Sequence, residues 1–243
     1  MAEPSGFAIA ARERAASFRS GRLSFVETAT LKTYLVARYA LQPPMPSGSI
    51  PRVAGPQEIV PFLVQETSWI HSSLLRVTSD LDEELFHARP GPKAPSIAFH
   101  LWHMARWADV FQAAAPNFAP ELMRIGPRNE IWQERSLANE WSIDVGLGWK
   151  GAGTGLDDDA SASLRLPSKA VVAIYAREAF DAAEGVLGAI RDDELLIETT
   201  NFFDDDPWPL LQHFTWHFGH GARHLGMMEA LKGVLGLRGT ATI

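Results

Sequence analysis

The sequence contains no cysteine in its 243 residues. The chain therefore forms no disulfide bond, and it has no thiolate that could act as a nucleophile or hold a zinc ion or an iron–sulfur cluster. Any metal ion bound by this chain must be held by histidine, aspartate or glutamate side chains. If the chemistry requires a thiol, that thiol must come from a second molecule.

Long apolar runs and concentrated basic segments are missing as well. No run approaches the roughly 20 apolar residues that a membrane-spanning helix needs, and Glu3, Arg12, Glu13 and Arg14 interrupt the stretch where a signal peptide would be apolar. The net charge of -7 and the scattered Lys and Arg residues argue against a nucleic-acid partner. We therefore expect a soluble, cytoplasmic protein that acts on a small molecule and binds neither nucleic acid nor membrane.

A proline-rich stretch divides the chain near residue 50. Prolines at positions 43, 44, 46 and 51 break any regular structure there. Residues 1–54 are therefore predicted to be an N-terminal arm and linker. Residues 55–243 are predicted to form the main domain, and the hydrophobic content of 46% is enough for a substantial core.

Several stretches of the main domain show the apolar period of amphipathic helices. They cover about residues 57–81, 96–114, 168–190 and 207–234. Ser96 is placed to cap the second helix at its N-terminus, and Gly236 suits the end of the last one.

The second and third predicted helices are separated by a long connection from about residue 116 to 167. It is polar and contains Trp and Gly; residues 129–141 suggest a short helix, and residues 146–155 look like a loop. We find no convincing strand pairs. This pattern predicts an all-α fold, a four-helix bundle with a long crossover connection, plus the N-terminal extension.

The last predicted helix carries four of the chain's eight histidines, at positions 213, 217, 220 and 224. At 100° per residue they stay within a sector of roughly 60°. Two neutral imidazoles four residues apart on a helix can hold one transition-metal ion if a third ligand comes from another element. The pairs His213/His217 and His220/His224 both have this spacing, so spacing does not choose between them.

The residues around the second pair are smaller. Gly219, Gly221, Ala222 and Gly226 would let a neighbouring helix or a ligand approach closely, which favours His220 and His224 as metal ligands. The alternative is that all four are interior histidines bonded to bundle partners or to water.

The second predicted helix offers the third ligand. Phe99, Met104 and Trp107 form an apolar stripe on the face that contains His103, so His103 is the expected ligand and His100 would contact the ligands or the substrate. Three histidines with one open position match the usual catalytic zinc site. His71 and His87 lack a partner pattern, and surface or capping roles are expected for them.

Two segments also resemble a known family. Ser96-Ile-Ala-Phe-His-Leu-Trp-His103 and His220-Gly-Ala-Arg-His224-Leu-Gly226 look like the two signature segments of the DinB/YfiT-like metal-binding four-helix bundles, over roughly residues 57–236. In that family one histidine of the second helix and a His-x-x-x-His pair of the fourth hold a divalent metal, and these map onto His103, His220 and His224. The family often continues with Arg and then Gly-Gln after the last histidine, whereas this chain has Leu225, Gly226 and Met227.

The resemblance implies a metal-dependent enzyme: in the first place an S-transferase that uses a low-molecular-weight thiol such as mycothiol or bacillithiol on a small electrophile, or else a related hydrolase or isomerase. The metal would be zinc or nickel, with iron as a further option, and His100 or His217 would relay protons. The alternative is a non-catalytic, stress-related or structural bundle that binds a metal or a small ligand. A homodimer is compatible with either function.

Overall fold

A computed structural model of the protein describes residues 58–200 and 206–240. The expected arm and linker of residues 1–54 lie outside the described residues. The described chain is mainly helical, in agreement with the predicted all-α class. Its elements are α3 (Ile59–Arg76), α4 (Glu83–His87), α5 (Ile97–Ala114), α6 (Ile131–Glu134), α7 (Leu137–Trp141), α8 (Gly148–Gly151), α9 (Asp158–Ser163), α10 (Lys169–Gly188), β1 (Glu198–Thr199), β2 (Trp208–Pro209) and α11 (Leu210–Val234), with short 3-10 helices at Ala115–Asn117, Pro120–Ile125 and Asp192–Glu194.

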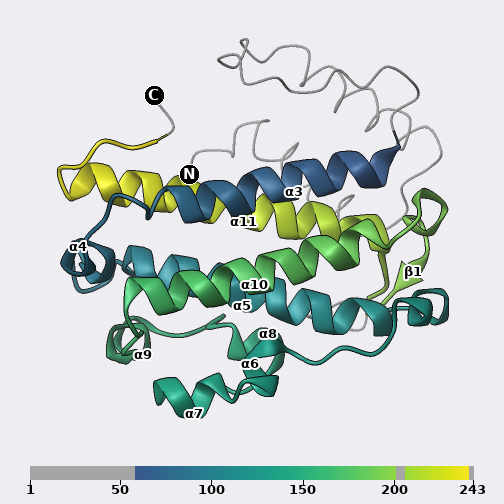
Figure 1. Ribbon diagram of the computed structural model, residues 1–243, viewed down its shortest axis with the longest axis horizontal. Helices are drawn as coiled ribbons and strands as arrows, with labels where there is room; N and C mark the ends of the chain where they lie inside the picture. The colour runs from purple at the N-terminus through teal and green to yellow at the C-terminus, as the bar shows by residue number, and fades with distance from the viewer. Residues whose placement is uncertain (1–57, 201–205, 241–243) are drawn as a thin grey trace, which may run out of the picture. The chain divides into compact units, whose positions relative to one another are not determined.

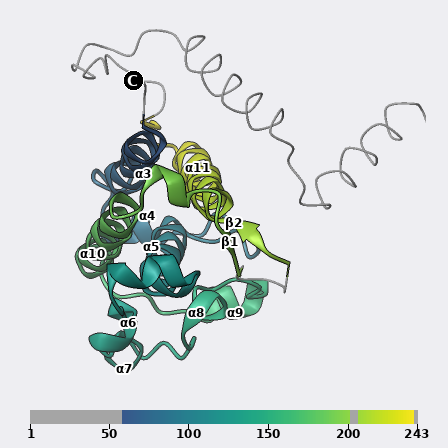
Figure 2. The same cartoon turned by 90° about the vertical axis from the view of Figure 1, so that its right-hand side faces the viewer.

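The long helices α3, α5, α10 and α11 pack as a bundle. Each of α10 and α11 packs against both α3 and α5, and the view along the helices shows the four of them grouped around a common interior (Figures 1 and 2). Leu74 of α3, Ala105 of α5, Ala179 of α10 and Met228 of α11 all belong to that interior core, and each is fully buried. Among the described helices, none is long and apolar enough to cross a membrane.

The crossover connection, residues 115–168, joins α5 to α10 and lies along one side of the bundle with α6, α7, α8 and α9 (Figures 1 and 2). Because α6 and α8 pack against α5, α5 has the bundle on one side and the crossover on the other. Its side chains from His100 to Gln112 are accordingly all buried. A helix covered on all sides in this way lacks the polar face of a surface helix.

Asp109 ties the crossover to α5. Its carboxylate is fully buried and accepts hydrogen bonds from the backbone N–H groups of Ile131 (2.8 Å) and Trp132 (2.9 Å), at the start of α6. It also accepts one from the Tyr175 hydroxyl of α10 (2.9 Å). One buried carboxylate thus joins α5, α6 and α10. These hydrogen bonds also offset the cost of burying its charge.

The Arg106–Glu130 ion pair makes a second tie. Nη2 of Arg106, a fully buried residue, donates to Oε2 of Glu130 (2.7 Å), and Oε1 of Glu130 accepts from the N–H of Gly148 (2.7 Å). Arg106 Nε also donates to the carbonyl of Gly151 (3.2 Å). These bonds fix α8 against α5 and so place the segment that follows α8.

Most helix ends lie where the sequence predicts them. The Ser96 hydroxyl accepts from the N–H of Phe99 (3.2 Å) and begins α5, and Gly236, with φ of 79°, follows the end of α11. The last helix begins at Leu210, a turn later than predicted, because Trp208–Pro209 is extended. It pairs antiparallel with Glu198–Thr199, so the expectation of no strand pairs was wrong for this short β1–β2 ladder. Within the segment expected to be a loop, α8 forms one helical turn.

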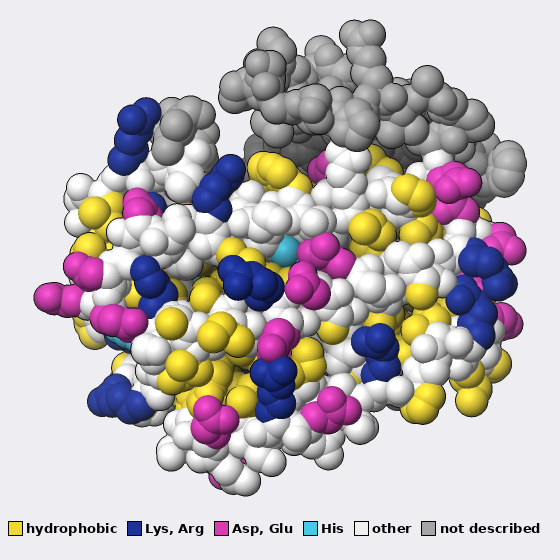
Figure 3. All heavy atoms as spheres, viewed as in Figure 1, with side chains coloured by type: hydrophobic (Ala, Val, Ile, Leu, Met, Phe, Trp, Pro, Cys, Tyr) yellow, Lys and Arg dark blue, Asp and Glu magenta, His cyan; other side chains and the backbone are white. Residues whose placement is uncertain are grey.

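One face of the molecule carries charges of both signs. Figure 3 shows Lys and Arg side chains interspersed with Asp and Glu over the described part of this face, without a continuous patch of either sign.

Candidate metal centre

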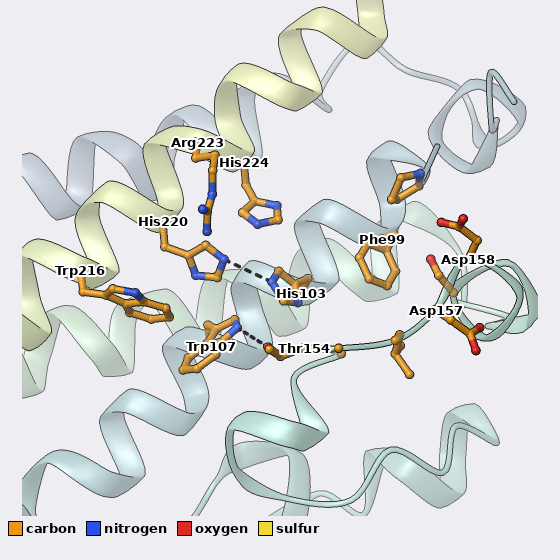
Figure 4. Close-up of a pocket in the computed structure, with 15 residues that line it drawn as sticks. Phe99, His103, Trp107, Thr154, Asp157, Asp158, Trp216, His220, Arg223 and His224 are labelled. Carbon is orange, nitrogen blue, oxygen red and sulfur yellow. Dashed lines mark hydrogen bonds between the residues drawn. The ribbon is translucent and has the colours of Figure 1, made fainter. Parts of the chain in front are cut away.

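Three buried imidazoles meet between α5 and α11. His103 comes from α5, and His220 and His224 come from successive turns of α11 (Figure 4). One nitrogen from each ring can be chosen so that the three lie within 4.8 Å of one another. The structure therefore brings together the three histidines that the sequence selected.

The His103 ring is oriented by the crossover. Its Nδ1–H donates to the carbonyl oxygen of Ala152 (2.5 Å), which leaves Nε2 as a lone-pair donor. That Nε2 lies 3.4 Å from Nε2 of His220. Two ligands about 2.1 Å from a tetrahedral ion are roughly 3.4 Å apart, so this spacing fits a shared ion. A metal-binding histidine whose other nitrogen donates to a carbonyl is the usual arrangement.

His224 is oriented by His100. Nδ1 of His224 lies 2.8 Å from Nδ1 of His100, so a hydrogen bond on this side leaves Nε2 of His224 available to the cluster. His100 is the expected neighbour of a ligand here, because it contacts His224 directly and is 4% exposed.

One ring nitrogen of His220 has no hydrogen-bonding partner among the described residues. Its Nδ1 is buried and makes no hydrogen bond to any described residue. Trp107 and Trp216 pack against the ring, with centroids at 5.6 and 4.8 Å. The aromatic rings hold the orientation of His220 while its Nε2 faces His103.

The histidines of the cluster are neutral near pH 7. Burial lowers the pKa of His103 to about 4, of His220 to about 3 and of His224 to about 2. Burial is the main cause of these low pKa values, and the positive charge of Arg223 also contributes to all three. Neutral imidazoles are the form that binds metal ions, so the donor set fits a divalent ion such as zinc.

The cluster lies at the wall of a pocket with a volume of about 320 Å³. The pocket is bounded by α5, by α11 and by the crossover segment from Gly153 to Asp158 (Figure 4). Exposed residues, including Asp157, Asp158 and Arg223, take part in its lining. A small molecule can therefore reach the histidines from solvent.

Gly153 lets the crossover approach α5 closely. Its φ of +85° is unfavourable for other residues, and a Cβ atom there would lie 2.7 Å from Cζ3 of Trp102. This close approach places the Ala152 carbonyl on His103.

The other half of the histidine stripe does not join the cluster. Nε2 of His217 lies 3.2 Å from Nε2 of His71, and Nδ1 of His71 lies 2.8 Å from Oε1 of Glu184. Nε2 of His213 lies 2.8 Å from the Thr199 hydroxyl. His213 and His217 thus have partners outside the cluster, His213 on β1 and His217 on α3.

The expectation that small residues around His220 and His224 allow close approach was right in part. Gly221 packs against α3, where a Cβ would lie 2.7 Å from Ile70, whereas a Cβ at Gly219 or Gly226 would meet nothing within 4 Å. The expectation of a surface or capping role for His71 was wrong, because His71 is 2% exposed and stacks on Phe180.

Two features of the site were missed. The Ala152 carbonyl is a backbone group, and the glycine-rich segment around it is the signal that a close approach was required. Arg223 lies three residues after His220 and just before His224, so helical spacing alone would have placed it near the cluster.

Comparisons with known proteins agree with this architecture. A family model described as the DinB superfamily matches residues 66–228. A solved structure, described as the conserved protein of a locus from Enterococcus faecalis, is similar with a TM-score of 0.60 at 14% identity, over 74% of this chain and 99% of the other. At this identity the likeness shows the fold alone. No curated protein sequence matches the chain significantly.

Proposed function

This chain belongs to the DinB superfamily, and from that membership and its three-histidine cluster we propose that it is a divalent-metal-dependent enzyme acting on a small molecule. The observation that carries the proposal is a set of three neutral histidines that line a solvent-accessible pocket. Three histidines leave a coordination position for a reactant, as in catalytic zinc sites. A filled ligand set in a closed cavity would instead favour the structural alternative.

The reaction that we propose is the transfer of a thiol to a small electrophile. A divalent ion held by His103, His220 and His224 would supply Lewis acidity, which lowers the pKa of a coordinated thiol or water molecule. Because the chain has no cysteine, the thiol is a cosubstrate. The support for a thiol rather than water comes from the resemblance to thiol-dependent members of the family, and hydrolysis or isomerisation uses the same site.

His100 and His217 are proposed as proton relays. His100 contacts His224 and is buried beside the cluster. His217 belongs to a hydrogen-bonded line through His71 to Glu184, whose side chain is 21% exposed and so reaches solvent. A neutral imidazole can accept a proton at one nitrogen and release one at the other.

The setting of the proposed enzyme is the cytoplasm, and we propose a homodimer. Exposed apolar side chains on α3 and α11 support pairing, since Trp69 is 46% and Val234 69% exposed.

Thermal unfolding of the full chain tests the function. The metal-free protein is titrated with zinc, nickel or ferrous iron, and then with bacillithiol or mycothiol, with the S-methylated thiol as a matched control. We expect the metal to raise the melting temperature, and the free thiol to raise it further only in the metal-loaded protein, because a ligand that binds the native state stabilises it.

Conjugation of the same thiols to monochlorobimane is measured in parallel. If no metal ion raises the melting temperature, the proposed metal centre is wrong. A metal effect without any thiol effect or conjugation would redirect the proposal to hydrolysis or to the non-catalytic bundle.

A further inference from the structure

The pocket beside the cluster has aromatic walls. Phe99 stacks on His103 with ring centroids 5.7 Å apart, and Trp107 and Trp216 pack edge to face with centroids 4.7 Å apart. All three line the same pocket (Figure 4). Such walls bury the apolar body of a ligand, while a few polar groups fix its orientation.

Arg223 brings a positive charge to this pocket. Its side chain extends from α11 alongside His220, toward the space between His220 and His224 (Figure 4). It lines the pocket, and no carboxylate of the described residues forms an ion pair with it. A guanidinium beside a divalent cation is electrostatically unfavourable, and an anion bound between the two charges offsets the repulsion.

The charge at the other end of the pocket is negative. Asp157 and Asp158 line it beyond Phe99 (Figure 4). Oδ1 of Asp157 already accepts the N–H of Ala160 at the start of α9, so this carboxylate has a structural role. An anionic group would be repelled from this end and attracted to Arg223, which gives a ligand one favourable orientation.

We propose that the pocket takes a small carboxylic acid, with its carboxylate between Arg223 and the three-histidine cluster and its apolar body against Phe99, Trp107 and Trp216. A planar carboxylate matches the donor fork of one guanidinium. A phosphate would bring a second negative charge toward a pocket that already contains Asp157 and Asp158. The assignment of this substrate class rests on the proposed function, because the bound carboxylate would lie beside the three-histidine cluster, where the reactant is expected to enter.

Calorimetric titration of the full-length protein tests the assignment. The probes are 3-phenylpropionate, its neutral isostere 3-phenylpropionamide, and phenyl phosphate. We expect the acid to bind at least about 10-fold more tightly than the amide, because a charge-assisted hydrogen bond is worth roughly 1.5–3 kcal/mol. Arg223→Gln should weaken binding of the acid by about 10-fold and leave the affinity for the amide unchanged.

Arg177→Gln is the matched control, since Arg177 is an exposed arginine of α10 outside the pocket lining. Its affinities should equal those of the wild type. Metal affinity supplies a readout that general damage would not produce: removing the charge of Arg223 should leave metal binding as tight or tighter, because a repulsion is lost. Weaker metal binding in Arg223→Gln would contradict this placement of the guanidinium.

Each titration is run on zinc-loaded and on chelator-treated protein. Equal affinities for acid and amide, or an acid affinity independent of Arg223 in both forms, would overturn the inference. If phenyl phosphate binds more tightly than 3-phenylpropionate and its binding depends on Arg223, the ligand class is a phosphate and the proposed carboxylate is wrong. If the wild type binds no zinc, the proposed function is refuted. The inference is then tested on the metal-free protein alone: it holds if the affinity for the acid depends on Arg223, and it fails if the affinity does not.

Discussion

His213 and His217 are spaced on α11 like His220 and His224, but the two pairs have different neighbours. Nε2 of His217 meets Nε2 of His71 at 3.2 Å, and Nε2 of His213 meets the Thr199 hydroxyl at 2.8 Å. Phe111 stacks on His217, and Phe118 stacks on His213. The second pair instead faces His103 across the interior and opens onto the pocket.

This difference shows that spacing makes chelation possible and that the neighbouring elements decide where it occurs. The first pair lies against α3 and the β1–β2 ladder, which offer hydrogen-bonding partners. The second pair lies against α5, which offers a third imidazole held by the crossover carbonyl of Ala152. The predictions below test this contrast and the packing that produces it.

Acidification is expected to have the largest effect, because both pairs are buried as neutral rings. Burial lowers the pKa of His213 to about 4 and of His220 to about 3 from an ordinary value of 6.5. The unfolded chain therefore takes up protons that the native state does not, so stability is present above pH 6.5 and is lost as pH falls from 6.5 toward these values. Each such histidine contributes about 1.4 kcal/mol per pH unit, and several together approach the roughly 5–15 kcal/mol stability of a domain.

Circular dichroism across this range, with and without zinc, measures this loss of stability. We expect metal-free protein to unfold between about pH 5 and 6, and zinc-loaded protein to unfold at lower pH, because the metal binds the native state. His87→Ala, a change at a half-buried histidine outside the stripe, should not move the midpoint. Constant stability of the metal-free protein down to pH 4 would show that the rings are not buried as neutral groups.

Removal of the Asp109 carboxylate is the next largest change. Asp109→Ala leaves the N–H groups of Ile131 and Trp132 without their acceptor and leaves Arg106 with one carboxylate fewer. We expect the free energy of unfolding to fall by about 3–5 kcal/mol, as when a buried ion pair loses a partner. Urea denaturation measures it, and Asp144→Ala, at an exposed position, should stay within about 0.5 kcal/mol of the wild type. A loss below about 1 kcal/mol would mean that Asp109 does not tie the crossover to α5.

A methyl group at Gly153 tests the crossover contact more locally. Both Gly153 and Gly155 have positive φ, but a Cβ would clash with Trp102 at Gly153 and would meet nothing within 4 Å at Gly155. Gly155→Ala should cost about 1–2 kcal/mol from backbone strain. Gly153→Ala should cost about 1–3 kcal/mol more from overpacking.

Zinc affinity should distinguish the same two variants. Displacement of the Ala152 carbonyl from His103 should weaken binding about 10–100-fold in Gly153→Ala, as when a partner of a metal ligand is lost. Gly155→Ala should bind zinc as the wild type does. Equal affinities in both variants would show that the carbonyl does not orient His103.

Much of the fold could be predicted because its signals are local. Apolar periods and the cap at Ser96 gave the long helices, and the length of the connection indicated the crossover. The β1–β2 ladder was not predicted, because two residues per strand are too few for an alternation signal.

The three clustered histidines could also be selected from sequence, through spacing and the family resemblance. His100 was expected beside these ligands, but the other partners of the α11 histidines could not be predicted. The contact of His71 with Glu184 joins residues 113 positions apart, and the Ala152 carbonyl carries no side-chain signal. Both depend on how helices and crossover pack, which periodicity does not specify.

Metal content is the most direct test of the contrast between the two pairs. Wild type, His217→Gln and His220→Gln are loaded with zinc, desalted, checked for helicity and measured by elemental analysis. The account predicts about one equivalent in the wild type and in His217→Gln, and close to none in His220→Gln. Retention of zinc by folded His220→Gln, or its loss from folded His217→Gln, would contradict the account.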